Sequence, residues 1–152
     1  MSKEIEGLVE TSTNLATINI VDNKILVDTL QRSSVESRKN EMAEIVEAHF
    51  TLAGASITHS DPYPGWAPNM ESPILNVAID VYNSLFGERP KTSALHAGLE
   101  TGLFLINYPH LDMISFGPTL RGVHSPKEQM HIPAVAKFWT FLTSILETIA
   151  KK

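Results

Sequence analysis

The chain has 152 residues and a formal net charge of -5 at pH 7, and its 43% hydrophobic and 19% charged residues are typical of a folded globular protein. Its 12 basic and 17 acidic residues are spread along the sequence, so no basic stripe indicates a nucleic-acid or membrane-surface partner. Because there is no cysteine, disulfides and thiolate metal sites are excluded, and any transition metal would need His, Asp or Glu ligands.

Neither a signal peptide nor a membrane span is expected. Residues 1–10 contain three glutamates and no long apolar run. The longest apolar stretches fall short of the roughly 18 residues that cross a bilayer. Together with the absence of cysteine, this favours a cytoplasmic protein.

The N-terminal part of the sequence predicts a β-hairpin. Residues 14–21 and 24–31 are rich in β-branched side chains and partly alternate between apolar and polar. Between them lie Asp22 and Asn23, which are turn residues that tolerate a left-handed backbone.

A helix of about five turns is predicted to follow the hairpin. Residues 33–36 have capping-box spacing, and Gly54 is expected at C′. Apolar positions recur at helical intervals between them, at Met42, Ile45, Val46, His49, Phe50 and Ala53. A short strand over 56–59 would complete a β-β-α-β unit.

The stretch 61–69 is rich in Pro and Gly and predicts a domain boundary. Beyond it, Ser72 and Pro73 begin a predicted helix that ends at Gly87. Short buried strands are expected over 93–95 and 112–116, with a helix opening at 98–100 between them. A last helix is expected from near Pro133. The second half therefore predicts an α-β-α-β-α order, and the fold class is α/β (α+β).

Two segments carry residues suited to chemistry. His124 precedes Ser125, Pro126 and Glu128, which have the spacing of an N-cap, N1 and N3 set, so the imidazole is expected on a rigid loop, as a metal ligand requires. The alternative is a surface histidine before a capped helix, which is the commoner case on sequence alone.

The segment 96–102 places two glycines at a strand-to-helix turn, where free backbone N–H groups can bind a carboxylate or an oxyanion. Close packing of the helix by the glycines is an equally good interpretation. Arg32 follows a predicted strand, and its guanidinium is suited to clamp a carboxylate. An ordinary exposed arginine is the alternative for that residue.

These segments resemble a known family. HAGLETG (96–102), YPHLDMISFGPT (108–119) and HSPKE (124–128) are similar to the C-terminal part of the zinc-dependent M20 peptidases, most closely the aminoacyl-histidine (Xaa-His) dipeptidases. NLATINIVDNKILVDTLQRSS (14–34) resembles their lid-domain hairpin.

The resemblance implies a domain division. Residues 1–61 would be the second half of a lid domain, a ferredoxin-like β-β-α-β half, and residues 62–70 a connector. Residues 71–152 would be the C-terminal segment of an α/β zinc-peptidase catalytic domain.

The resemblance also implies roles for single residues. His124 would be the last zinc ligand, and Arg32 and Asn14 of the hairpin would face the active site and bind substrate. His96 and Gly98 would line the substrate pocket, and the role of Glu100 stays open.

Two divalent metals, usually zinc, would activate the attacking water in the intact enzyme. The family's H-x-D pair, bridging Asp, paired Glu residues, further Asp and lid His have no counterpart in this sequence. His59 and Asp61 have the H-x-D spacing but lie at the domain crossing, where we interpret the match as coincidence. No catalytic residue is assigned, and the sequence predicts a C-terminal portion of an Xaa-His dipeptidase that is inactive alone.

Two other functions stay open. One is a non-catalytic α/β module that associates with a complementary N-terminal chain or with itself. The other is a self-contained metallohydrolase, which would draw its ligands from His59, Asp61, His96, Glu100 and His124. The remaining histidines, His49, His110 and His131, are expected to be structural or solvated.

Overall fold

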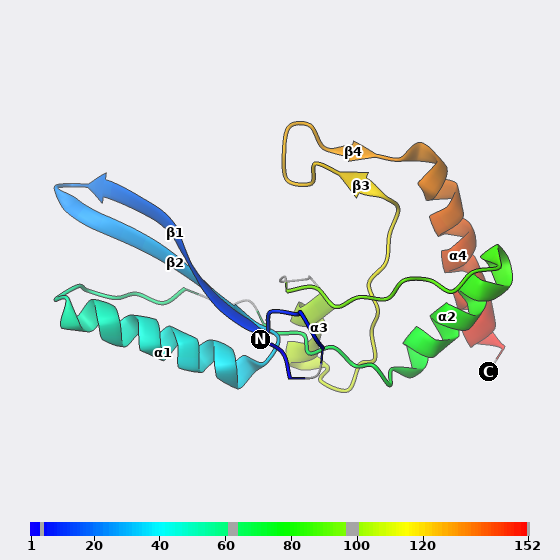
Figure 1. Ribbon diagram of the computed structural model, residues 1–152, viewed down its shortest axis with the longest axis horizontal. Helices are drawn as coiled ribbons and strands as arrows, with labels where there is room; N and C mark the ends of the chain where they lie inside the picture. The colour runs from blue at the N-terminus through cyan, green and yellow to red at the C-terminus, as the bar shows by residue number, and fades with distance from the viewer. Residues whose placement is uncertain (4, 61–63, 97–100, 152) are drawn as a thin grey trace. The chain divides into compact units, whose positions relative to one another are not determined.

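The computed structural model describes residues 1–3, 5–60, 64–96 and 101–151. The chain divides into two compact units (Figure 1). The hairpin unit comprises residues 1–68 and 93–111, and the helix-pair unit comprises residues 69–92 and 112–152. The prediction of a lid portion, a connector and a catalytic portion stays a prediction.

The hairpin unit is built on β1 (Thr11–Val21) and β2 (Lys24–Ser33), which pair antiparallel. The two-residue turn between them has positive φ at both positions, 51° at Asp22 and 58° at Asn23, as a type I′ turn requires. The predicted hairpin is therefore confirmed. Its register shifts between Leu15 and Thr17, so Ala16 forms a β-bulge.

Helix α1 (Glu36–Leu52) packs against both strands of the hairpin (Figure 1). Its more buried positions recur at helical spacing, at Lys39, Met42, Ala43, Val46 and Phe50. Burial alternates along β2, because odd-numbered residues from Val27 to Ser33 are covered and even-numbered ones are exposed. The hairpin thus keeps one covered face and one open face.

The ends of α1 match the prediction at one end only. Gly54 has φ 78° at C′, and the N–H groups of Gly54 and Ala55 donate to the carbonyls of Thr51 and Phe50, which is a complete Schellman motif. At the start, the N-cap is Val35 and not Ser33. Ser33 instead ends β2, since its partner across the ladder is Thr11.

The three short strands predicted at 56–59, 93–95 and 112–116 are not strands. A strand exists only where its backbone finds a partner edge. The described residues form two two-stranded sheets, and none of these three segments pairs with a strand of either sheet. Within the hairpin unit, the expected β-β-α-β order is therefore β-β-α. The next element of that unit is the seven-residue helix α3 (Thr101–Asn107).

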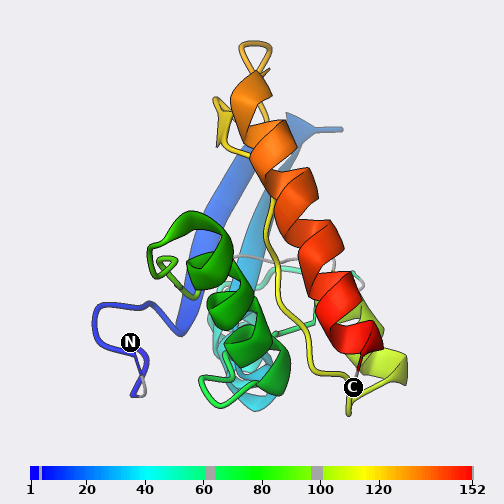
Figure 2. The ribbon, with the colours of Figure 1, turned by 90° about the vertical axis from the view of Figure 1, so that its right-hand side faces the viewer.

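The helix-pair unit contains α2 (Pro73–Phe86) and α4 (Ile132–Ala150), which lie side by side (Figures 1 and 2). As predicted, the Ser72 side chain caps α2 by accepting the Leu75 N–H, and Gly87 ends the helix with φ 70°. The core of this unit contains Ala78, Phe141 and Ile145, and half-buried side chains pack around it: Ile74, Val81, Tyr82, Phe86 and Ile114.

A small hairpin of β3 (Leu120–Arg121) and β4 (Gln129–Met130) precedes α4. Among the helices of the described residues, α4 alone has the length and apolar composition to cross a membrane. The core helix of a soluble protein meets the same criterion, and α4 buries Phe141 and Ile145 against α2. The last helix predicted from near Pro133 is confirmed, whereas the expectation of short apolar runs did not anticipate a helix of this apolar composition.

The turn at Asn23 gives a direct test of the hairpin. Asn23→Val places a β-branched side chain at positive φ and should lower the free energy of unfolding by about 1–2 kcal/mol. Asn23→Gly, the matched variant, should leave it unchanged or raise it slightly, because glycine has no Cβ to strain. Urea unfolding followed by circular dichroism measures both, and equal midpoints for the two variants would contradict the assigned turn.

Candidate functional site

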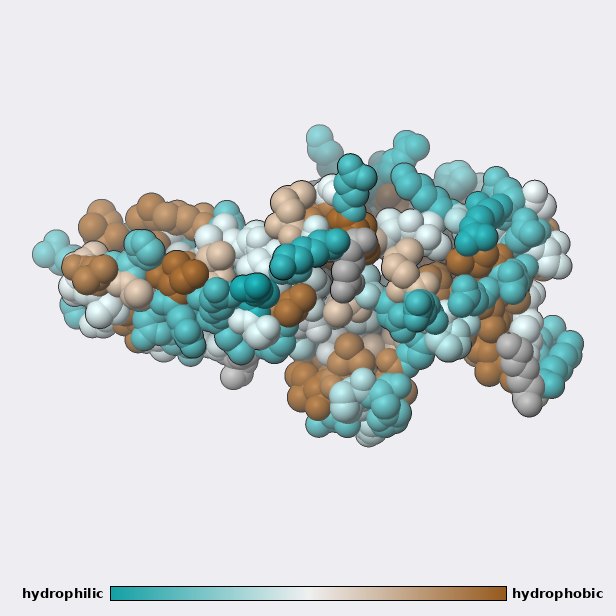
Figure 3. All heavy atoms as spheres, turned by 60° about the horizontal axis from the view of Figure 1, so that its bottom comes forward, coloured by the Kyte–Doolittle hydropathy of each residue, from teal (hydrophilic) through white to brown (hydrophobic). Residues whose placement is uncertain are grey.

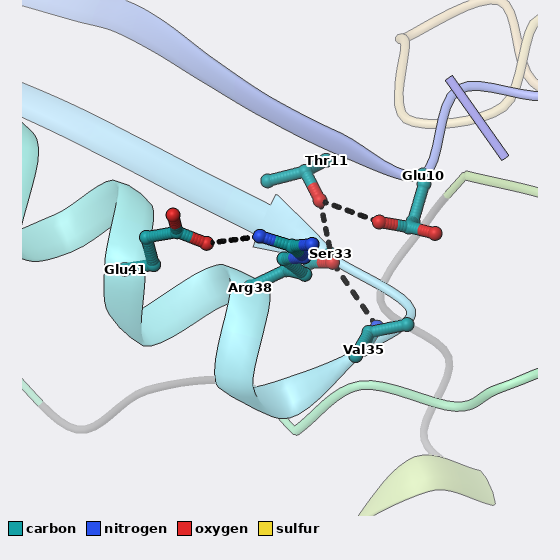
Figure 4. Close-up of polar contacts among 6 residues, drawn as sticks. All are labelled: Glu10, Thr11, Ser33, Val35, Arg38 and Glu41. Carbon is teal, nitrogen blue, oxygen red and sulfur yellow. Dashed lines mark hydrogen bonds and ion pairs between the residues drawn. The ribbon is translucent and has the colours of Figure 1, made fainter.

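The base of the hairpin is fixed by side-chain hydrogen bonds on its covered face (Figure 4). The Oγ1 of Thr11 and the Oγ of Ser33 lie 2.9 Å apart, and the same Ser33 oxygen accepts the Val35 N–H at 3.0 Å. The backbone N–H of Ser34 donates to the Glu10 carbonyl at 3.2 Å. The first rung of the ladder is therefore cross-linked, which restricts the spacing of the next rung.

A second segment is anchored on this base. The carboxylate of Glu36 accepts the Gly65 N–H at 3.1 Å and pairs with the ammonium of Lys39 at 2.7 Å. A Cβ at Gly65 would lie 2.7 Å from the Ser33 carbonyl oxygen, so only glycine allows this approach. Partial burial raises the pKa of Glu36, but hydrogen bonds from Lys39 and Gly65 outweigh it and hold the pKa below its ordinary value.

The glycines of segment 96–102 have a packing role in the structure. Gly102 is buried in α3, and a Cβ there would lie 3.3 Å from the Pro64 carbonyl oxygen and 3.8 Å from the Trp66 side chain. Close packing was one of the two interpretations of this motif, and for Gly102 it is confirmed. Gly98 and Glu100 lie outside the described residues.

The next rung of the hairpin carries the candidate site. Ser12 pairs with Arg32 across the ladder, and the Oγ of Ser12 lies 2.6 Å from the Nε2 of His96. Asn14 is two residues along β1 from Ser12, on the same face, and pairs with Leu30. Asn14 and Arg32 are exposed and His96 is half-buried.

Three of the predicted substrate-binding residues, Asn14, Arg32 and His96, are therefore brought to one face of the hairpin base. Cross-strand diagonal neighbours lie about 7–8 Å apart, within reach of one small ligand. A guanidinium, an amide and an imidazole together suit a carboxylate. Sequence reasoning missed Ser12. The signal for it was its place opposite Arg32, which is visible only once the register is known.

His124 lies in the loop between β3 and β4, not before a helix. Its φ is 62°, and its backbone N–H donates to the Glu128 carboxylate at 2.9 Å. Ser125 donates its hydroxyl to the Gly122 carbonyl at 2.6 Å and accepts the Lys127 N–H at 3.2 Å. The predicted helix start at Ser125 is wrong, because the chain turns directly into β4.

Within the part of the chain that the structure describes, no group of three or more His, Asp or Glu side chains is placed to hold a metal ion. Two of the five residues of the self-contained site, Asp61 and Glu100, lie outside the described ranges. His59 pairs with Glu47 at 2.9 Å, and His96 is held by Ser12. The exposed imidazole of His124 is the remaining candidate ligand.

Comparison with known proteins shows what this chain is similar to. No family model matches the sequence. The chain is 41% identical over 147 residues to the cytosol non-specific dipeptidase of Escherichia coli (strain K12), covering 97% of this chain and 30% of that protein. It is homologous to the C-terminal portion of an M20 dipeptidase.

The structural comparison agrees. The crystal structure of aminoacylhistidine dipeptidase from Vibrio alginolyticus matches with a TM-score of 0.80 and 42% identity, over 97% of this chain and 30% of that chain. The chain thus spans less than a third of the length of these two relatives. The resemblance to M20 dipeptidases and the mixed α/β class are confirmed, whereas the lid-domain assignment stays a prediction.

The lowered pKa of Glu36 gives a pH-dependent prediction. Because the folded-state pKa lies below the ordinary 4.5, the contribution of Glu36 is fully present above pH 4.5 and is lost as the pH falls through the folded value. Glu36→Gln should cost about 0.5–1 kcal/mol at pH 7, a figure that allows for solvent screening of an exposed carboxylate, and less at pH 3, because the contribution of the carboxylate is lost progressively below pH 4.5. Urea unfolding at both pH values measures this, with Glu44→Gln on the same helix as the control.

The hydrogen bond from the His124 N–H to the Glu128 carboxylate gives a second prediction. Glu128→Ala removes the acceptor of the His124 N–H, so hydrogen exchange of that amide should accelerate about tenfold, the effect of a charged hydrogen bond weakened by exposure. Glu128→Gln keeps a neutral acceptor, so its exchange rate at the His124 amide should fall between those of the unchanged chain and of Glu128→Ala. Equal exchange rates in all three proteins, measured by NMR, would show that the carboxylate does not hold the loop.

Proposed function

We propose that this chain is the C-terminal portion of a cytoplasmic dinuclear-zinc dipeptidase that hydrolyses Xaa-His-type dipeptides. In this proposal Asn14, Arg32 and His96 bind the substrate, and His124 is a metal ligand. The single observation that carries the proposal is the meeting of Asn14, Arg32 and His96 on one hairpin face, in a chain 41–42% identical to two dipeptidases. Gly98, which lies outside the described residues, is proposed as a further substrate contact on the family resemblance alone.

The substrate class follows from the relatives and from the site. One relative is named for aminoacylhistidine and the other for non-specific dipeptide hydrolysis. A dipeptide ends in a free carboxylate, and the guanidinium of Arg32 has the planar donor geometry to bind a carboxylate through two hydrogen bonds. An imidazole N–H from His96 and the amide of Asn14 add neutral donors to the same face.

The described residues fit only part of a zinc site. A dinuclear centre needs several His and carboxylate ligands together with a general base. The described residues supply His124, on a loop held by Ser125 and Glu128, and no group of three ligands. We therefore propose that the other ligands and the base come from a complementary N-terminal segment, and that this chain alone hydrolyses no dipeptide.

A non-catalytic interaction module is the second candidate, and exposed apolar side chains favour it. Ile20 and Ile25 near the hairpin tip are 78% and 74% exposed. Figure 3 shows apolar side chains at the surface there, at its left end. Unpaired strand edges and exposed apolar surface favour association with a complementary chain or with a second copy.

A chimera tests the dipeptidase proposal. This chain replaces the homologous segment of the E. coli dipeptidase, and hydrolysis of an Xaa-His dipeptide is measured with zinc present. The chimera should be active, and His124→Ala should lower kcat/KM by about 100-fold or more, as expected for loss of a metal ligand. His131→Ala, at the N-cap of α4, is the matched histidine control and should leave the activity within a few fold.

A folded chimera without activity, or one that tolerates His124→Ala, would contradict the proposal. The isolated chain is measured in parallel by calorimetric zinc titration and by the same hydrolysis assay. Weak zinc binding without hydrolysis is expected. Two tight zinc sites, or hydrolysis that His124→Ala abolishes, would instead establish a self-contained metallohydrolase.

A further inference from the structure

A short hydrogen bond ties the half-buried His96 to the hairpin. The Oγ of Ser12 and the Nε2 of His96 are 2.6 Å apart and 84 residues apart in sequence. Among the described residues, this is the one hydrogen bond of the His96 ring, and it engages Nε2 and not Nδ1.

We propose that Ser12 is a positioning residue that sets the tautomer of His96 for carboxylate binding, an inference that rests on the proposed function. A serine hydroxyl can donate or accept, whereas a neutral imidazole has one N–H and one bare nitrogen. The tautomer of a histidine is set by the hydrogen bond that its other nitrogen makes. When Ser12 donates to Nε2, the ring proton resides on Nδ1.

The ligand requires this direction of donation. A carboxylate accepts hydrogen bonds only, so the nitrogen that meets it must carry a proton. If a neutral His96 donated from Nε2 to Ser12, Nδ1 would present a lone pair to the carboxylate and repel it. Ser12 as donor therefore converts His96 into a neutral N–H donor that complements the cationic fork of Arg32.

The position of Ser12 suits this role. Ser12 is the cross-strand partner of Arg32, so its Cβ lies about 4.5–5.5 Å from that of Arg32. The neighbouring rung is cross-linked by Thr11 and Ser33, which limits movement of the strand that carries Ser12. A serine side chain has a single rotatable bond before its oxygen, so His96 is held at a defined place beside the arginine.

The tautomer can be measured directly in the isolated chain. In ¹⁵N-labelled protein above pH 8, His96 should show a protonated Nδ1 and a bare Nε2. Ser12→Ala should shift both nitrogens toward the averaged values of a free imidazole, and Ser12→Thr should restore the original values, because threonine keeps the hydroxyl. Thr13→Ala, on the opposite face of β1, is the matched control and should change neither nitrogen.

Backbone amide shifts of β1 and β2 confirm in each variant that the ladder is intact. Two results would overturn the proposal: a protonated Nε2 in the unchanged chain, or identical His96 shifts in Ser12→Ala with the ladder preserved. Neither result depends on zinc or on catalysis, so the measurement decides the role of Ser12 even where the dipeptidase proposal fails.

The E. coli chimera gives a second readout. There Ser12→Ala should raise the KM for the dipeptide about tenfold and leave kcat within twofold, the pattern expected when ground-state and transition-state binding are lost equally. Ser12→Thr should restore KM. An unchanged KM in Ser12→Ala, alongside a changed His96 spectrum, would show that the hydrogen bond orients the ring without serving substrate binding, and would overturn the proposal.

Discussion

The candidate site depends on one unpaired residue in β1. Counting back from the turn, a regular ladder would place Thr13 opposite Arg32 and would put Asn14 on the face opposite to it. The bulge at Ala16 shifts the pairing by one residue, so that Ser12 lies opposite Arg32 and Asn14 joins the open face. A one-residue slip exchanges the two faces of a strand completely. Without the bulge, the serine, the arginine and the asparagine could not share a surface.

The sequence predicted the turn and the helix end of the hairpin unit, but it did not predict the bulge. The turn at Asp22 and Asn23 and the Schellman motif at Gly54 rest on the backbone preferences of single residues, which sequence displays directly. The bulge at Ala16 has no such signature, since alanine needs no special backbone there. The family resemblance was therefore enough to name Arg32 and Asn14 as candidate site residues. Ser12 could be named only from the observed strand register, which places it opposite Arg32.

Long-range partners account for the predicted elements that did not form. Residues 56–59, 93–95 and 112–116 have suitable composition for strands, but pairing decides whether a strand exists, and composition does not report the partner. The helix start predicted at Ser125 was wrong for a related reason. Ser125 and Glu128 make local hydrogen bonds that a helix start would also use, yet these bonds close a turn between β3 and β4 instead.

The residues proposed for substrate recognition and the residue proposed for metal binding belong to different units of this chain. The residues proposed to bind the carboxylate all belong to the hairpin unit, where backbone register and the Ser12 hydroxyl determine their geometry. His124 belongs to the helix-pair unit, and its loop is held by its own hydrogen bonds. Because the hydrogen bonds of each arrangement close within its own unit, the proposed carboxylate-binding face does not require a complete metal centre among the described residues.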